Sequence, residues 1–292
     1  QGSGCPGRAH RTQGQIVGES TILKFLVMSD LHLVASPELA HGLDSAERLV
    51  VGVESINQEY PDADFCVLAG DLVDRGDKEA YQRLKAIMQP LRIPYYLALG
   101  NHDDREAFLS VFGRAHCDSN GHVQRVIDHK GYRVIVLDSL EAGRHTGVLC
   151  DKRLAWLRDQ LKAGLDRPVI VIIHHHVNKV RFFMDDYLLE NPNELLDVLR
   201  IHPDVRHVIS GHVHISTTGI IQGIPFTTVA GGHYTFAVSL GSDSRKTVKK
   251  LEGPAQYAVV LADEASVTVH FHNYIDQHTA LYENTTKSVT PC

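Results

Sequence analysis

The sequence of 292 residues predicts an α/β fold, layered as a sandwich of mixed sheets flanked by helices. Apolar runs typical of buried strands alternate with segments whose apolar residues recur every three or four positions, as in amphipathic helices. Toward the C-terminus, shorter strand-like runs follow one another across turns and look antiparallel. This mixture favours a layered sandwich over a purely parallel, doubly wound sheet.

The individual elements follow from these patterns. Several strand candidates are continuously apolar rather than alternating, which indicates strands covered on both faces. The first helix candidate repeats apolar residues at spacings of three and four from Ala46 to Ile56, and the last follows Asn191-Pro192, a favourable helix start. The strand candidates are 22–28, 65–69, 94–99, 133–138, 168–173, 205–210, 215–221, 224–229, 256–262 and 266–273, and the helix candidates are 45–60, 77–89, 104–112, 152–163 and 193–201.

Composition limits the class of protein. We expect one domain over residues 21–275, preceded by a loose or non-native arm at 1–20 and followed by a tail at 276–292. A net charge of −6 argues against binding to duplex nucleic acid or to an anionic membrane. No run approaches the ~20 apolar residues of a membrane helix, and the N-terminus has no signal-like apolar region. Five cysteines without a C-x-x-C pair suggest a reducing compartment, so we expect a cytoplasmic protein.

Five short polar motifs each follow an apolar strand candidate. Ligands in open α/β folds bind beside the carboxyl ends of strands, so we expect these motifs to converge on one rim. Their carboxylates, carboxamide and imidazoles are enough to hold two transition-metal ions, which can activate water against a phosphate ester. The motifs are Asp30-x-His32, Gly70-Asp71-x-x-Asp74, Gly100-Asn101-His102-Asp103, His174-His175-His176 and Gly211-His212-x-His214.

The residue types suggest which side chains bind an ion and which orient the loops. In an extended segment, residues two apart point the same way, so Asp30 and His32 could grip one ion. Asp71 is the expected bridging ligand, because a carboxylate has two oxygens. Asp74, Arg75 and Asp77 could orient this loop, although turn and helix-start chemistry explains Asp77 equally well.

The remaining motifs complete two donor sets. Asn101 offers a neutral oxygen, and His102 would sit beside the ions and contact phosphate or a leaving group. The first set is Asp30, His32, Asp71 and His214; the second is Asp71, Asn101, His212 and one histidine of 174–176, since strand residues alternate faces. These donors suit iron or manganese, with zinc or cobalt as alternatives. His233 could be a further phosphate contact or an ordinary loop residue.

With these motifs in order, residues 22–235 resemble the calcineurin-like metallophosphoesterase superfamily. Three stretches most resemble its class III cyclic nucleotide phosphodiesterases and related glycerophosphodiesterases. They are Ser29-Asp30-Leu31-His32-Leu33, Gly70-Asp71-Leu72-Val73-Asp74-Arg75-Gly76-Asp77 with Ala80-Tyr81, and Gly100-Asn101-His102-Asp103-Asp104-Arg105.

The resemblance implies a metallophosphoesterase-like α/β/β/α sandwich and a catalytic group of Asp71, Asn101 and His102. The family usually has His-His-Pro, with the first histidine as ligand, where this chain has His175-His176-Val177. On that basis His175 is the expected ligand and His176 a substrate contact, with His174 as the rival ligand. In relatives, tails such as 236–292 help form a homo-oligomer or edge the substrate pocket.

The implied reaction is hydrolysis of a small phosphodiester. A 3′,5′-cyclic nucleotide such as cAMP is the first expectation, and a 2′,3′-cyclic nucleotide or a glycerophosphodiester the alternative. A metal-binding scaffold without turnover is a reading of another class, disfavoured because no ligand is missing. Hydrolysis of a C–N or C–O bond is disfavoured by the bridging aspartate and the Asn-His pair.

Overall fold

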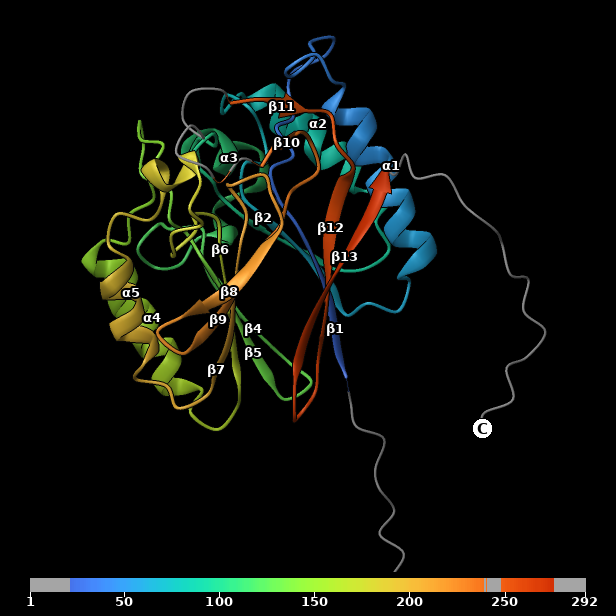
Figure 1. Cartoon of the computed structure of the whole chain (residues 1–292). Helices are drawn as coiled ribbons and strands as arrows, with labels where there is room; N and C mark the ends of the chain where they lie inside the picture. The colour runs from blue at the N-terminus through green and yellow to red at the C-terminus, as the bar shows by residue number, and fades with distance from the viewer. Residues whose placement is uncertain (1–21, 239, 241–247, 276–292) are drawn as a thin grey trace, which may run out of the picture.

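The computed structural model describes residues 22–238, 240 and 248–275. Two sheets lie face to face, with helices covering both outer faces (Figure 1). One sheet has the strand order β13-β12-β1-β2-β3 and the other β4-β5-β6-β7-β9-β8, while β10 and β11 form a separate short pair. The predicted α/β/β/α sandwich is therefore confirmed. The expected arm at 1–20 and tail at 276–292 lie outside the described residues.

The helices and strands lie close to their predicted positions. The first sheet and its helices comprise β1 (Leu23–Met28), α1 (Ser45–Glu59), β2 (Phe65–Ala69), α2 (Lys78–Met88), β3 (Tyr95–Ala98), α3 (Arg105–Phe112), β12 (Ala255–Ala262) and β13 (Val267–Ile275). The second comprises β4 (Arg125–His129), β5 (Tyr132–Leu137), α4 (Asp151–Ala163), β6 (Val169–Ile173), α5 (Pro192–Leu199), β7 (Val205–Ser210), β8 (Thr217–Ile221) and β9 (Ile224–Thr228). The short pair is β10 (Thr235–Phe236) and β11 (Lys250–Leu251), and two 3₁₀ turns span Arg114–His116 and Phe183–Tyr187.

Strand β1 shows why the strand candidates are apolar on both faces. Phe25 and Val27 belong to the core between the two sheets, whereas Leu26 and Met28 pack with α1 and α2 in an outer core. Because successive side chains of a strand point to opposite faces, a strand between two packed layers must be apolar at every position.

Three strands were not anticipated. β4 pairs with β5 across Lys130 and Gly131, which both have positive φ, at 45° and 79°, as a two-residue hairpin turn requires. The polar residues at the ends of β4 hide its pattern in the sequence. β10 and β11 are two residues each and carry no periodicity. The expected antiparallel pairing of β8 with β9 and of β12 with β13 is confirmed.

No helix within the described ranges has the length and apolar character needed to cross a bilayer.

An ion pair with a buried carboxylate ties the start of α3 to the end of β5. Asp138 is fully buried and accepts two hydrogen bonds from Arg105, at 3.0 and 2.9 Å, and further ones from the backbone of Val123 and Leu140. We expect Asp138→Ala to lower the free energy of unfolding by about 3 kcal/mol, because removing one partner leaves a desolvated cation unpaired. Urea denaturation measures this change. Asp138→Asn keeps a polar side chain of the same shape and should cost less; an equal cost would contradict the role of the charge.

Candidate metal centre

All five motifs meet where strands of both sheets end. Asp30 and His32 follow β1, Asp71 follows β2, and Asn101 follows β3 in the first sheet. The histidines at 174–176 and at 212 and 214 follow β6 and β7 in the second sheet. Two backbone contacts join these ends, since Asp30 N donates to Gly70 O and Gly211 N donates to His174 O. The predicted convergence on one rim is therefore found.

The first donor cluster contains Asp30, His32, Asp71 and His214, all buried. Nε2 of His214 lies 3.3 Å from Oδ1 of Asp30 and 3.2 Å from Nε2 of His32. Nε2 of His32 lies 3.7 Å from Oδ2 of Asp71. These are the four residues that the sequence assigned to one ion.

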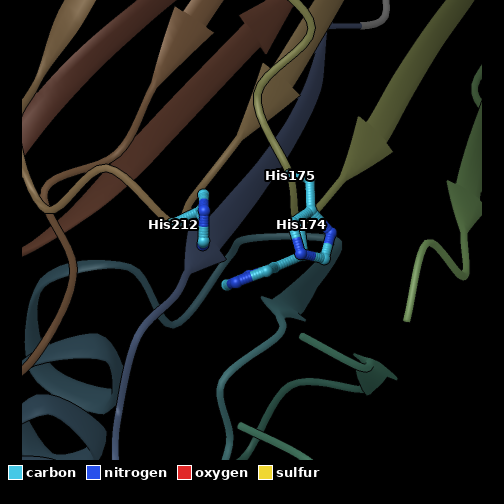
Figure 2. A group of neighbouring side chains, drawn as sticks. All are labelled: His174, His175 and His212. Atoms are coloured by element: carbon cyan, nitrogen blue, oxygen red, sulfur yellow. The ribbon is translucent and has the colours of Figure 1, made fainter. Parts of the chain in front are cut away.

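The second cluster contains His174, His175 and His212, which Figure 2 shows close together at the ends of two neighbouring strands. Nε2 of His174 lies 3.3 Å from Oδ2 of Asp71 and 3.3 Å from Oδ1 of Asn101. Asp71 thus belongs to the first cluster and also contacts His174 of the second. The neighbour of Asp71 and Asn101 is His174, whereas the sequence favoured His175.

His175 makes a different set of contacts. Its Nδ1 lies 2.7 Å from Oγ of Ser139, and its ring meets that of His174 edge-on at 5.0 Å. Its Nε2 is buried and has no hydrogen-bond partner. His174 and His175 both lie beyond the end of β6, where the strand alternation no longer applies, and both belong to the second cluster, whereas His176 does not.

Left-handed backbone conformations direct the donors inward. Asp30, His32 and Asp71 have φ of 54°, 47° and 49°, and His212 and His214 have 71° and 51°. The extended geometry assumed from the sequence for Asp30-x-His32 and His212-x-His214 was therefore wrong, although the side chains still converge. Non-glycine residues rarely adopt this region, and such strain concentrates at functional sites.

Two glycines allow the loops to approach one another closely. A Cβ atom on Gly100 would clash with Oδ1 of Asp71 and would lie 2.6 Å from Nε2 of His174. A Cβ atom on Gly211 would lie 2.7 Å from Oδ2 of Asp30. No other side chain fits at either position without moving a donor.

Hydrogen bonds set which ring nitrogen faces the centre. Nδ1 of His174 donates to Ala69 O at 2.9 Å, and Nδ1 of His214 donates to Tyr234 O at 2.9 Å. Nδ1 of His32 lies 3.1 Å from Oδ1 of Asp74. In the neutral rings each Nε2 is then a lone-pair donor aimed inward, the arrangement common for metal-binding histidines.

This arrangement fits a pair of cations. Nε2 of His32 and Nε2 of His214 face each other across 3.2 Å, and Nε2 of His174 faces oxygens of Asp71 and Asn101. Nitrogen and oxygen atoms gathered in this way are donors that a transition-metal ion could bind once the rings are deprotonated. The buried Nε2 of His175 has no hydrogen-bond partner among the described residues, which is rare for a polar atom unless it binds an ion or water, so His175 remains the rival ligand of the second cluster. The residues present therefore fit two metal ions.

The pKa shifts reflect the same crowding. Burial opposes the charged form of His174, yet the charge of Asp71 raises the pKa of His174 to about 9. Burial would raise the pKa of Asp71, but the neighbouring histidines, led by His174, hold it well below its usual range. Burial lowers the pKa of His214 to about 4, and that of His212 well below its usual value. Metal binding would therefore release a proton from His174.

His102 lies beside the clusters at the pocket wall. Its backbone N–H donates to Oδ1 of Asp71 at 2.9 Å, and its Nδ1 donates to Asp74 O at 2.8 Å. Its Nε2 has no hydrogen-bond partner among the described residues, and the side chain lines the pocket. Asp103, next along, accepts hydrogen bonds from Leu72 N, Val73 N and Gly100 N, so one carboxylate holds both metal-binding loops.

Two of the predicted substrate contacts are buried beside the donor histidines. His176 is buried against His212 and Asp185, and His233 is buried beside His32; neither lines the pocket. The pocket walls instead come largely from residues that the sequence did not single out. No motif marks them, because they come from short segments far apart in the chain: His145, Met184, Tyr187, Tyr234, Phe236 and Lys250.

Comparisons with known proteins agree with this geometry. The calcineurin-like phosphoesterase family matches residues 23–216. A protein described as a probable cyclic nucleotide phosphodiesterase from Rhodopseudomonas palustris is 34% identical over 252 residues, covering 85% of this chain and 91% of the relative. A probable glycerophosphodiester phosphodiesterase from Arcobacter nitrofigilis is 31% identical over 247 residues, covering 83% of this chain and 90% of the relative.

Solved structures show the same fold. A dimetal phosphatase from Danio rerio superposes with a TM-score of 0.66 at 15% identity, covering 87% of this chain and 97% of that one. The family match spans the strands and loops that carry every donor described above. The chain therefore belongs to the calcineurin-like phosphoesterase family and is a phosphoric ester hydrolase.

Proposed function

We propose that this protein is a binuclear metal-dependent phosphodiesterase that hydrolyses small phosphodiesters, with 3′,5′-cyclic nucleotides such as cAMP as first substrate. The observation that carries the proposal is the pair of donor clusters joined at Asp71 beneath an open pocket. Relatives described as cyclic nucleotide phosphodiesterases support the substrate class, among them a cAMP phosphodiesterase from Pseudomonas aeruginosa, 31% identical over 189 residues. A cavity of about 200 Å³ suits a small ester.

The chain's residues prepare the site for in-line hydrolysis. Two bound transition-metal ions would supply Lewis acidity and lower the pKa of water toward neutrality. Asp30, His32, Asp71 and His214 would hold one ion, and Asp71, Asn101, His174 and His212 the other. We propose His174 rather than His175, because only His174 has a ring nitrogen beside both Asp71 and Asn101. Iron and manganese are the proposed metals, with zinc or cobalt as alternatives.

His102 is proposed to assist the phosphate and the leaving group from its free Nε2. We expect His102→Ala to keep both ions and to slow turnover by ~100-fold or more, because the loss removes proton donation but no ligand. Metal analysis together with steady-state kinetics measures both properties. Loss of an ion in this variant would contradict the assigned role.

The substrate class is tested on manganese-reconstituted protein with 3′,5′-cAMP, 2′,3′-cAMP, glycerophosphocholine and p-nitrophenyl phosphate. A preference for 3′,5′-cAMP supports the proposal. A preference for 2′,3′-cAMP or glycerophosphocholine would move the enzyme to the alternative substrates, in line with its glycerophosphodiesterase relative. A preference for the monoester would overturn the diesterase assignment. Absence of turnover on any of them, and on bis-p-nitrophenyl phosphate, would favour the scaffold reading. The predicted cytoplasmic location and homo-oligomer stay predictions.

A further inference from the structure

Lys250 places a positive charge at the wall of the metal-site pocket. It lies on β11, and it lines the pocket together with Tyr234 and Phe236. Its Nζ lies 4.1 Å from the centre of the Tyr234 ring. That ring stacks on His214 of the first donor cluster, with centroids 4.1 Å apart. The ammonium of Lys250 is thus one aromatic ring away from the metal ligands.

The partners of this ammonium do not neutralise it. Nζ lies 3.2 Å from Nε2 of His41, and no ion pair to Lys250 is found in the part of the chain that the structure describes. Asp74 is the carboxylate whose charge acts on Lys250. Its Oδ1 is already engaged with Nδ1 of His32 at 3.1 Å, and Nε of Arg75 lies 3.6 Å from Oδ2. Lys250 therefore presents surplus positive charge to whatever enters the pocket.

The position of Lys250 over the Tyr234 ring lets its charge discriminate between cationic and uncharged substrate groups. Aromatic faces are the usual protein groups that receive a quaternary ammonium. In this pocket the ammonium group of Lys250 already lies over the Tyr234 ring. A cationic substrate group at this wall would find the ring face occupied and would meet a like charge. Like-charge repulsion is a means by which binding sites reject wrong partners.

We propose that Lys250 determines substrate specificity, selecting phosphodiesters whose second alcohol is uncharged, such as a ribose or glycerol, and rejecting those that carry choline or ethanolamine. This inference rests on the proposed phosphodiesterase function and refines its substrate class.

The test uses two substrates that differ only in charge. p-Nitrophenyl phosphocholine and p-nitrophenyl 3,3-dimethylbutyl phosphate share a leaving group and almost the same shape, but only the first carries a quaternary ammonium. We expect the wild-type holoenzyme to favour the uncharged ester in kcat/KM by about 10-fold, the size of effect for like charges a few ångströms apart when solvent screens them strongly, as it does the exposed Lys250. Lys250→Gln should bring this ratio close to unity, and Lys250→Glu should invert it.

A matched control is available one residue away. Lys249 is exposed and does not line the pocket, so Lys249→Gln removes the same charge and should keep the wild-type ratio. Equal ratios in wild type and Lys250→Gln, with both esters hydrolysed, would overturn the specificity inference alone. Hydrolysis of bis-p-nitrophenyl phosphate without turnover of either alkyl ester would also overturn it. Failure on every diester would overturn the proposed function itself.

Discussion

Asp71→Ala is expected to lose the metal pair and to lower kcat/KM by about 1,000-fold or more. Asp71 is a carboxylate of the first donor cluster that also contacts the second, with Oδ2 lying 3.7 Å from Nε2 of His32 and 3.3 Å from Nε2 of His174. Its removal takes a donor from each ion at once. Metal ions typically contribute several kcal/mol of transition-state stabilisation, and each 1.36 kcal/mol is a factor of ten in rate.

Elemental analysis after reconstitution and dialysis measures the metal content of this variant. Asp62→Ala is the control. Asp62 is an exposed carboxylate that pairs with Lys24, near the start of β1, whereas the metal donors follow the end of that strand. It should keep both ions and full activity. Retention of two ions by Asp71→Ala would refute the bridging role. Circular dichroism separates loss of metal from loss of fold, since Asp71 Oδ1 also accepts a hydrogen bond from His102 N.

The adjacent histidines give the second large effect. We expect His174→Ala to lose the ion held with Asn101 and to reduce turnover by at least ~100-fold, because the ring is wedged between Asp71 and Asn101. His175→Ala should keep two ions and lose ~10-fold or less, since Nδ1 of His175 is hydrogen-bonded to Ser139 and it is His174 that contacts both Asp71 and Asn101.

Comparing the two variants decides between the ligand favoured by the sequence and the one favoured by the geometry. Each substitution removes one buried imidazole, so each serves as the other's control for the loss of packing. Metal content and kcat are measured on both after the same reconstitution. Loss of an ion from His175→Ala, with His174→Ala retaining both ions, would show that His175 is the ligand.

Most of the fold could be predicted from local patterns. Strands buried on both faces must be apolar at every position, and amphipathic helices must have apolar residues at spacings of three and four. The sequence pattern therefore predicts β1 to β3 and α1 to α5. β4 was missed because its Arg125, Asp128 and His129 interrupt the apolar run. The two-residue strands β10 and β11 are defined by pairing alone.

The sequence by itself determined the α/β architecture and the donor types, because each motif directly follows a strand and parallel strands end at a common rim. Only the tertiary structure decided which histidine after β6 approaches Asn101. That choice depends on the space that Gly70 and Gly100 leave around the ring of His174. It also decided the pocket wall, where Lys250 meets Tyr234 because β10 pairs with β11. Contacts between residues distant in the chain leave no periodic or motif signal in a single sequence.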